Sequence, residues 1–214
     1  MKVALIGAGF VGTQLIRELT SRGHQVTVLV RNTEKIEAAN GVEAVKSDVL
    51  HDQELAEKLK GHDAVINAFN AGWTNPNLYN DFMEGSQAIQ KAVKESGVKR
   101  FITIGGAGSL YIGEQQLVDS PDFPEAYKAG ATAARDYLNI IRKEEALDWT
   151  FFSPAIEMHQ GTSGVRTGNY RTGTENPVFN KEGRSIMSAE DVAVVIADEL
   201  ENPKFIRQRF TAAY

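Results

Sequence analysis

The chain has 214 residues, of which 42% are hydrophobic and 24% charged, with a formal net charge of −5 and no cysteine. This composition predicts one globular domain of residues 1–214, and no apolar run approaches the roughly 18 residues of a membrane span. The missing cysteines exclude disulfides and thiolate chemistry. The acidic balance argues against a nucleic-acid partner, and the missing signal-peptide pattern predicts a cytoplasmic protein.

Short apolar strands alternate with amphipathic helices along most of the chain. Strands are predicted at Val3–Ile6, Gln25–Val30, Val42–Lys46, Ala64–Asn67, Arg100–Ile104, Trp149–Phe152 and Phe210–Ala213. Helices are predicted from Val11 to Leu19 and at Gln53–Leu59, Leu78–Ser96, Tyr127–Glu144 and Ala189–Leu200. Solidly apolar strands alternating with helices indicate an α/β fold with a doubly wound, mostly parallel sheet.

Two long loops interrupt this alternation. Residues 105–125 follow the fifth strand and residues 155–184 follow the sixth, and both stretches are rich in glycine. Loops of this length are usually functional or disordered, and both leave carboxyl ends of strands, where open α/β sheets bind ligands. We therefore expect a small substrate-side region at residues 155–185 within the single domain.

The first strand and first helix are joined by a GxGxxG pattern. Gly7 permits the tight turn, Gly9 lets backbone approach a pyrophosphate, and Gly12 lets helix and strand pack closely. Phe10 and Val11 lie in the same turn, at a helix start whose free N–H groups bind anions. The pattern predicts a dinucleotide site; the alternative is that the glycines only turn the strand into the helix.

The end of the second strand indicates which dinucleotide is bound. NAD sites usually place a carboxylate there on the ribose hydroxyls, but this chain has Arg31 and Asn32. A guanidinium suits a 2′-phosphate, so NADP(H) is predicted in preference to NAD(H), with Asn32 available to a ribose hydroxyl. The alternative is that Arg31 is a solvated surface charge.

Further cofactor contacts are expected where the later strands end. They are Asp48 and Val49, then Ala68, Phe69 and Asn70, then Gly105 and Gly106, then Ser153, Pro154 and Ala155. Two alternatives stay open, because Asp48 could cap the following helix and Pro154 could simply stop its strand.

Six stretches resemble the atypical short-chain dehydrogenase/reductase group and, within it, the NADH-flavin reductase family. They are residues 30–32, 63–70, 105–110, 148–155, 166–171 and 209–214, and they span essentially the whole chain. The resemblance implies an NAD(P)-binding Rossmann fold and hydride transfer from nicotinamide to a flavin or a similar acceptor. Members of the group usually have a glycine loop one residue longer than this one. The resemblance therefore does not specify the path of the pyrophosphate over the shorter loop.

The chain lacks the Tyr and Lys, four residues apart, with which many short-chain dehydrogenases move a proton. A flavin takes hydride and receives its other proton from water, so it needs no such pair. Weak catalytic candidates are Ser109, Tyr127 and Lys128, against the alternatives of a turn residue and an ordinary surface helix.

The second long loop carries candidate acceptor-binding residues. Arg166 and Arg171 could hold a flavin phosphate and Tyr170 could stack on the ring, against the alternative of solvated loop charges. The four histidines have no metal-ligand spacing, so we interpret them as surface residues and expect no metal.

Three hypotheses of function follow. The first is an NAD(P)H-dependent reductase of a flavin, as substrate or bound acceptor, or of a quinone. The second is a redox sensor that binds NADP(H) without turnover and acts through a protein partner. The third, a nucleotide-sugar epimerase or dehydratase, is disfavoured by the missing Tyr/Lys pair. Whether the protein forms a homo-oligomer is left open.

Overall fold

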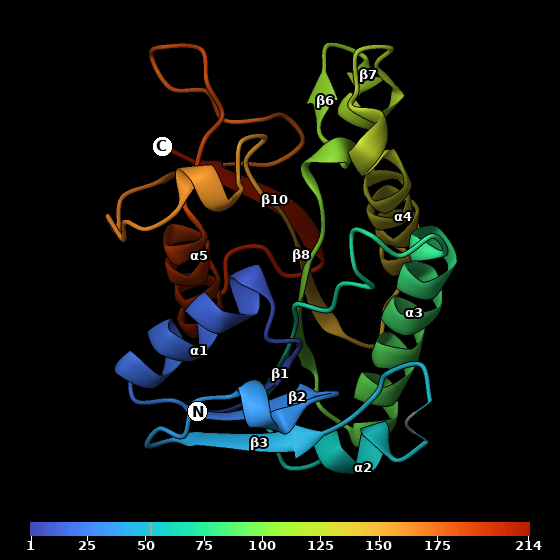
Figure 1. Ribbon diagram of the computed structural model, residues 1–214, viewed down its shortest axis with the longest axis vertical. Helices are drawn as coiled ribbons and strands as arrows, with labels where there is room; N and C mark the ends of the chain where they lie inside the picture. The colour runs from blue at the N-terminus through green and yellow to red at the C-terminus, as the bar shows by residue number, and fades with distance from the viewer. Residues whose placement is uncertain (52) are drawn as a thin grey trace.

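The computed structural model describes residues 1–51 and 53–214 and is built around one large sheet (Figure 1). The strand order is β3-β2-β1-β4-β5-β8-β10-β9. Neighbouring strands are parallel, except that β9 runs antiparallel to β10. The strands are β1 Lys2–Ile6, β2 Gln25–Val30, β3 Val42–Lys46, β4 Ala64–Asn67, β5 Arg100–Ile104, β8 Asp148–Ser153, β9 Arg171–Gly173 and β10 Gln208–Ala213.

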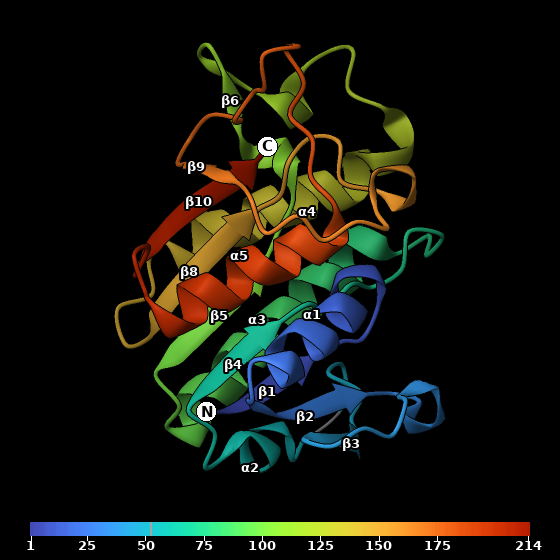
Figure 2. The same ribbon diagram turned by 90° about the vertical axis from the view of Figure 1, so that its left-hand side faces the viewer.

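Helices cover both faces of the sheet. Figure 1 shows α1 and α5 on one side and α2, α3 and α4 on the other, and Figure 2 looks onto α1 and α5. The helices are α1 Phe10–Ser21, α2 Leu55–Leu59, α3 Leu78–Ser96, α4 Glu125–Ile141 and α5 Ala189–Glu201. The predicted doubly wound α/β fold is therefore confirmed, and its strand order reverses between β1 and β4.

Two apolar layers explain why the strands are apolar along their whole length. In β1, Val3 and Leu5 face the layer under α1 and α5, whereas Ala4 and Ile6 face the layer under α3 and α4. Successive side chains of a strand point to opposite faces, so a sheet covered on both sides needs apolar residues at every position.

The bounds of α2 and α4 differ from the prediction in ways that have a physical reason. The second helix begins at Leu55 rather than Gln53, with Glu54 at its N-cap. Asp48 therefore does not cap it, and that alternative is wrong. The fourth helix begins at Glu125, directly after Pro124, and ends at Ile141 rather than Glu144. Proline suits a helix start because its missing N–H would have no partner there.

The two long loops contain little regular structure. The first holds a small hairpin, β6 Tyr111–Ile112 paired with β7 Gln115–Gln116, and the second holds β9. Short 3₁₀ turns are η1 Thr33–Lys35, η2 Ala107–Ser109, η3 Leu117–Asp119 and η4 Gln160–Thr162. Among the described residues, no helix has the length and apolar character needed to cross a bilayer.

Candidate functional site

The turn between β1 and α1 requires glycine. Gly7 has a φ of +92°, and a Cβ there would lie 2.7 Å from the carbonyl oxygen of Ala68. A Cβ at Gly12 would lie 2.2 Å from the carbonyl oxygen of Gly7. Gly9 differs, because its Cβ would meet no atom within 4 Å. Two glycines thus allow close packing, and the third leaves open space above the helix start.

The start of α1 has the features of an anion site. Gly9 is its N-cap, no side chain caps the helix, and its first turn contains no acidic residue. The N–H groups and positive dipole end of a twelve-residue helix are therefore not neutralised by the described side chains. Phe10 is 37% exposed beside this start, whereas Val11 packs against the core. A pyrophosphate fits the space over Gly9.

The residues after β2 lie open to solvent. Arg31 is exposed, and its guanidinium has no hydrogen bond or ion pair with a described residue. Asn32 caps a short turn, since its Oδ1 accepts a hydrogen bond from the N–H of Glu34 at 3.0 Å. Arg31 is thus available to an anion, while the side-chain oxygen of Asn32 is already used.

The turn after β3 is held by Asp48. Its carboxylate accepts from the N–H of Leu50 at 3.3 Å and lies 3.4 Å from Nδ1 of His51. Val49 is 8% exposed and belongs to the core under α2 and α3. A contact from Asp48 to an adenine edge stays a prediction. Because the side chain of Val49 is buried, Val49 could contact a cofactor mainly through its backbone.

The end of β4 presents backbone to the same edge of the sheet. Asn67 fixes this end, because its Oδ1 accepts from the N–H of Phe69 at 3.0 Å and its Nδ2 donates to Thr103 at 3.1 Å. The ring of Phe69 turns away and stacks on Phe82 of α3, with centroids 6.2 Å apart. Of the predicted contacts here, Phe69 can therefore offer only its backbone.

The side chain of Asn70 is also used within the chain, since it accepts from the N–H of Gly72 at 2.7 Å. Ala68 continues the ladder, with its N–H donating to Ile6 at 2.9 Å. If residues 68–70 flank the cofactor as predicted, they would contact it through main-chain groups.

Glycines after β5 let the chain run close to its neighbours. A Cβ at Gly105 would lie 1.9 Å from Cζ of Phe151, and one at Gly106 would lie 3.4 Å from Cβ of Ala134 on α4. The loop after β5 therefore lies directly against β8 and α4.

Ser109 is buried rather than open to a ligand. Its hydroxyl lies 3.3 Å from that of Ser153, and Nη1 of Arg209 donates to Ser109 at 3.3 Å and to Ser153 at 3.5 Å. The Arg209 side chain is fully buried and forms an ion pair with Glu175. Sequence reasoning did not single out Arg209, because it directly precedes the predicted strand Phe210–Ala213, whereas the observed β10 includes it.

Pro154 and Ala155 are likewise buried just beyond β8. Ser109, Ser153, Pro154 and Ala155 are thus all buried at or just beyond the carboxyl ends of β5 and β8. Catalytic contact by Ser109 stays a prediction, because its hydroxyl is already bonded within the chain.

Tyr127 lies at the start of α4 and is 54% exposed. Its ring meets that of Trp73 edge-on, with centroids 5.5 Å apart and an interplanar angle of 88°. Lys128 is exposed on the next position, about 100° around the helix. Sequence reasoning did not single out Trp73, a lone tryptophan in a loop with glycine and asparagine.

The predicted acceptor-binding residues of the second long loop are bonded within the chain. Arg166 pairs with Glu18 of α1 at 2.7 Å, and its hydrogen bond lowers the pKa of that carboxyl. Tyr170 donates to Asp198 of α5 at 2.5 Å, and Arg171 donates to two main-chain carbonyls. Arg166 and Tyr170 hold the loop on α1 and α5, and Arg171 ties it to Phe179 and to the terminal Tyr214. Contact of these three side chains with a flavin stays a prediction that this arrangement does not favour.

Asp191, in the first turn of α5, anchors the same loop. Its buried carboxylate accepts from the N–H groups of Thr167 and Gly168 at 2.9 and 2.8 Å, and from the hydroxyl of Tyr214 at 2.6 Å. Burial alone would raise the pKa of Asp191, but these hydrogen bonds bring it below its ordinary value of 3.8.

Asp191→Asn is expected to lower the unfolding free energy by about 2 kcal/mol at pH 7, because hydrogen bonds to a charged group are lost. A carboxyl whose pKa falls on folding stabilises fully above its unfolded pKa, and this contribution is lost as pH falls through the folded pKa. Urea unfolding of both proteins from pH 7 to pH 3 checks this. The difference should shrink below about pH 4; a difference that stays constant contradicts the assignment.

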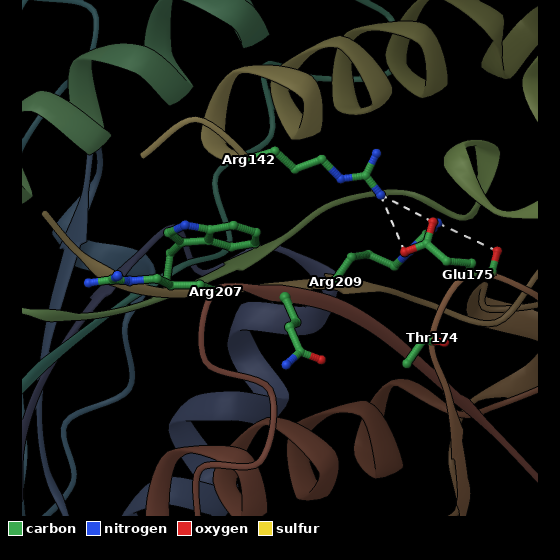
Figure 3. A pocket seen from close by; sticks show the side chains of 7 residues that line it. Arg142, Thr174, Glu175, Arg207 and Arg209 are labelled. Atoms are coloured by element: carbon green, nitrogen blue, oxygen red, sulfur yellow. Dashed lines mark hydrogen bonds and ion pairs between the residues drawn. The ribbon is translucent and has the colours of Figure 1, made fainter. Parts of the chain in front are cut away.

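A separate cavity of about 360 Å³ lies far from the glycine turn. Figure 3 shows Arg142 and Arg209 pointing toward Glu175 at its edge. Trp149 and Gln208, near the amino ends of β8 and β10, also line it. The cavity therefore opens on the sheet face beside α4 rather than at the carboxyl edge.

His24 corrects one expectation. It is 8% exposed and lies between the N-terminal amine, at 3.2 Å, and Glu201, at 2.8 Å, so it is not a surface residue. Within residues 1–51 and 53–214, no group of three or more acidic or histidine side chains is arranged to hold a metal ion.

The glycine turn, the uncapped helix start and the open Arg31 all lie on the side where the parallel strands end, at the reversal of strand order. Open α/β sheets bind nucleotides at this place. The fold and site thus define a dinucleotide-binding protein of the Rossmann class.

Comparison with known proteins agrees with this assignment. A family model described as NAD(P)H-binding matches residues 7–203, so the chain belongs to this NAD(P)H-binding family. The uncharacterised protein YwnB of Bacillus subtilis is 36% identical over 215 aligned residues, covering 99% of this chain and 97% of YwnB.

Two solved structures are similar over the whole chain. A "putative epimerase" from Bacteroides thetaiotaomicron is 44% identical with a TM-score of 0.91, covering 100% of this chain and 96% of the other. A "putative NADH-flavin reductase" from Streptococcus pneumoniae is 36% identical with a TM-score of 0.88, covering 100% and 99%.

Proposed function

We propose that the protein is an NAD(P)H-dependent reductase of a flavin or a quinone-like planar acceptor, with NADP(H) preferred to NAD(H). One observation carries this proposal: the predicted catalytic side chains do not form a Tyr/Lys proton-transfer pair at the carboxyl edge. Ser109 is buried against Arg209, and Tyr127 packs on Trp73 with Ala131 rather than lysine one turn later. An acceptor that takes its proton from water suits such an edge.

When bound, the reduced nicotinamide supplies a hydride, and the acceptor takes that hydride and one proton from water, so NADPH and a proton yield NADP⁺ and the reduced acceptor. The chain's own part is to bind and orient. Gly9 and the start of α1 suit the pyrophosphate, Arg31 the 2′-phosphate, and the main chain after β4 the neighbouring ribose.

The purified chain with NADPH and a panel of FMN, riboflavin and a naphthoquinone tests the proposal. Oxidation of NADPH that depends on the acceptor is the expected result. Tight NADPH binding without oxidation by any acceptor would contradict it and favour the sensor. Because one similar structure is called an epimerase, a nucleotide sugar belongs in the panel, and its conversion would also contradict the reductase.

Arg31→Ala is expected to weaken NADPH binding at least about tenfold and to leave NADH binding nearly unchanged, because only NADPH carries the charged 2′-phosphate. Titration calorimetry with both nucleotides measures this. Arg17→Ala serves as the matched control, because Arg17 is also an exposed arginine but lies on α1, away from the end of β2. Equal affinity of the wild type for NADPH and NADH would overturn the preference.

A further inference from the structure

Trp73 is held in place although more than half of it is exposed. It lies in the loop between β4 and α3, and its ring rests over Gly130 of α4, where a Cβ would come within 2.8 Å of its Cζ3. Tyr127, one turn before Gly130, meets the ring edge-on. A side chain at position 130 would displace the indole, so glycine there makes the seat.

Both aromatic residues of this pair are more than half exposed. Trp73 and Tyr127 are 56% and 54% exposed, whereas the other tryptophan, Trp149, is 3% exposed. Tryptophan and tyrosine contribute large apolar contact areas when they are covered. A preformed and exposed pair of rings is therefore suited to cover a planar ligand.

The helix α4 also places this pair beside the nucleotide edge. Gly130, which seats Trp73, and Ala134, which touches the loop at Gly106, are one turn apart on one face of α4. The loop carrying Trp73 starts at the end of β4, next to β1 and the glycine turn. Trp73, in the loop after β4, thus packs on the same face of α4 that the loop after β5 contacts.

We propose that Trp73 and Tyr127 form a stacking platform for the planar ring of the oxidised acceptor. This inference rests on the proposed reductase function and adds the residues that select a flat, electron-poor ring. Stacking on an electron-rich indole suits the electron-poor ring of an oxidised flavin or quinone. Because Trp73 acts by binding the acceptor, the affinity for the nucleotide should not depend on it.

Tryptophan fluorescence tests the platform without turnover. The chain has two tryptophans, and Trp149 is buried with its Nε1 donating to the carbonyl of Glu144 at 3.0 Å. Titration with oxidised FMN, riboflavin and a naphthoquinone in the presence of NADP⁺ should give saturable quenching in the wild type. Trp73→Phe keeps a ring but leaves only Trp149, so the saturable component should disappear. Quenching of equal size in this variant would overturn the proposal.

Steady-state kinetics gives the second readout. Trp73→Ala should raise the KM for the acceptor about five- to tenfold and leave the KM for NADPH within about twofold, whereas Trp73→Phe should retain most acceptor binding. Ile112→Ala on β6 removes another apolar side chain of 48% exposure and is the matched control. Thermal unfolding confirms that the variants fold.

The two proposals fail differently. An unchanged acceptor KM in Trp73→Ala would overturn the platform and leave the reductase standing. Saturable quenching of Trp73 without NADPH oxidation by any acceptor would support the platform's ring binding and overturn the reductase. The three ligands further separate binding through the flavin ring from binding through the FMN phosphate.

Discussion

Gly12→Ala is expected to weaken NADPH binding by more than about a hundredfold and to destabilise the fold by several kcal/mol. Its Cβ would lie 2.2 Å from the carbonyl oxygen of Gly7, and both groups belong to the turn that joins β1 to α1. Neither backbone can move without shifting the start of α1, where we place the pyrophosphate. Titration calorimetry and thermal unfolding measure the two effects.

Gly23→Ala is the matched control for this variant. Gly23 lies just beyond the other end of α1, with a φ of +82° and no atom within 4 Å of a Cβ. Alanine there should cost about 1 kcal/mol of stability through backbone strain alone, with NADPH affinity unchanged. Wild-type affinity in Gly12→Ala would contradict the placement of the site.

Glu199→Ala is expected to lower the unfolding free energy by about 3–5 kcal/mol, because it leaves Arg100 as an unpaired buried charge. Oε1 of Glu199 accepts from Nη2 of Arg100 at 2.8 Å and from the N–H of Phe205 at 3.1 Å, while Oε2 accepts from the N–H of Lys204 at 2.9 Å. The pair ties β5 to the end of α5. Urea unfolding at pH 7 measures the loss.

Glu95→Ala provides the comparison for an exposed ion pair. Glu95 lies 3.8 Å from Lys91 on the surface of α3, with 56% of its side chain exposed. Removing such a carboxylate should change stability by less than about 0.5 kcal/mol. Equal losses in Glu199→Ala and Glu95→Ala would show that the buried pair does not stabilise the fold as argued.

The fold could be predicted from the sequence because its strands are apolar on both faces. Val3, Ala4, Leu5 and Ile6 leave no polar face, which indicates a sheet covered by helices on both sides. The hairpin β6–β7 was not predicted, because strands of two residues contain no periodicity to detect. The short α2 was predicted to begin two residues too early, at Gln53, because its N-cap, Glu54, makes no side-chain capping hydrogen bond that would mark the start.

The glycine turn could be located because its function requires glycine at fixed spacing. The acceptor side could not, because it depends on contacts between distant segments. Arg166 and Tyr170 form part of a charged motif that suggests ligand binding, yet the partners that use them, Glu18 and Asp198, lie 148 and 28 residues away. Local charge alone does not tell a ligand-binding arginine from one that anchors a loop.

Trp73 and Arg209 illustrate the same limit. The seat of Trp73 is Gly130, more than fifty residues later, and the partner of Arg209 is Glu175 in the long loop. Neither pair follows a helical or strand spacing. Only the folded chain shows that one is an exposed ring packed on α4 and the other a buried charge paired with Glu175.

Gly9→Ala tests most directly that the turn after β1 binds the nucleotide. A Cβ at Gly9 meets no protein atom within 4 Å, so the fold should accept it, with a melting temperature within about 2 °C of the wild type. The methyl group would occupy the space into which we place the pyrophosphate. Titration calorimetry should therefore show at least about a tenfold loss of NADPH affinity in a stable protein. Wild-type affinity for NADPH in Gly9→Ala would contradict the account.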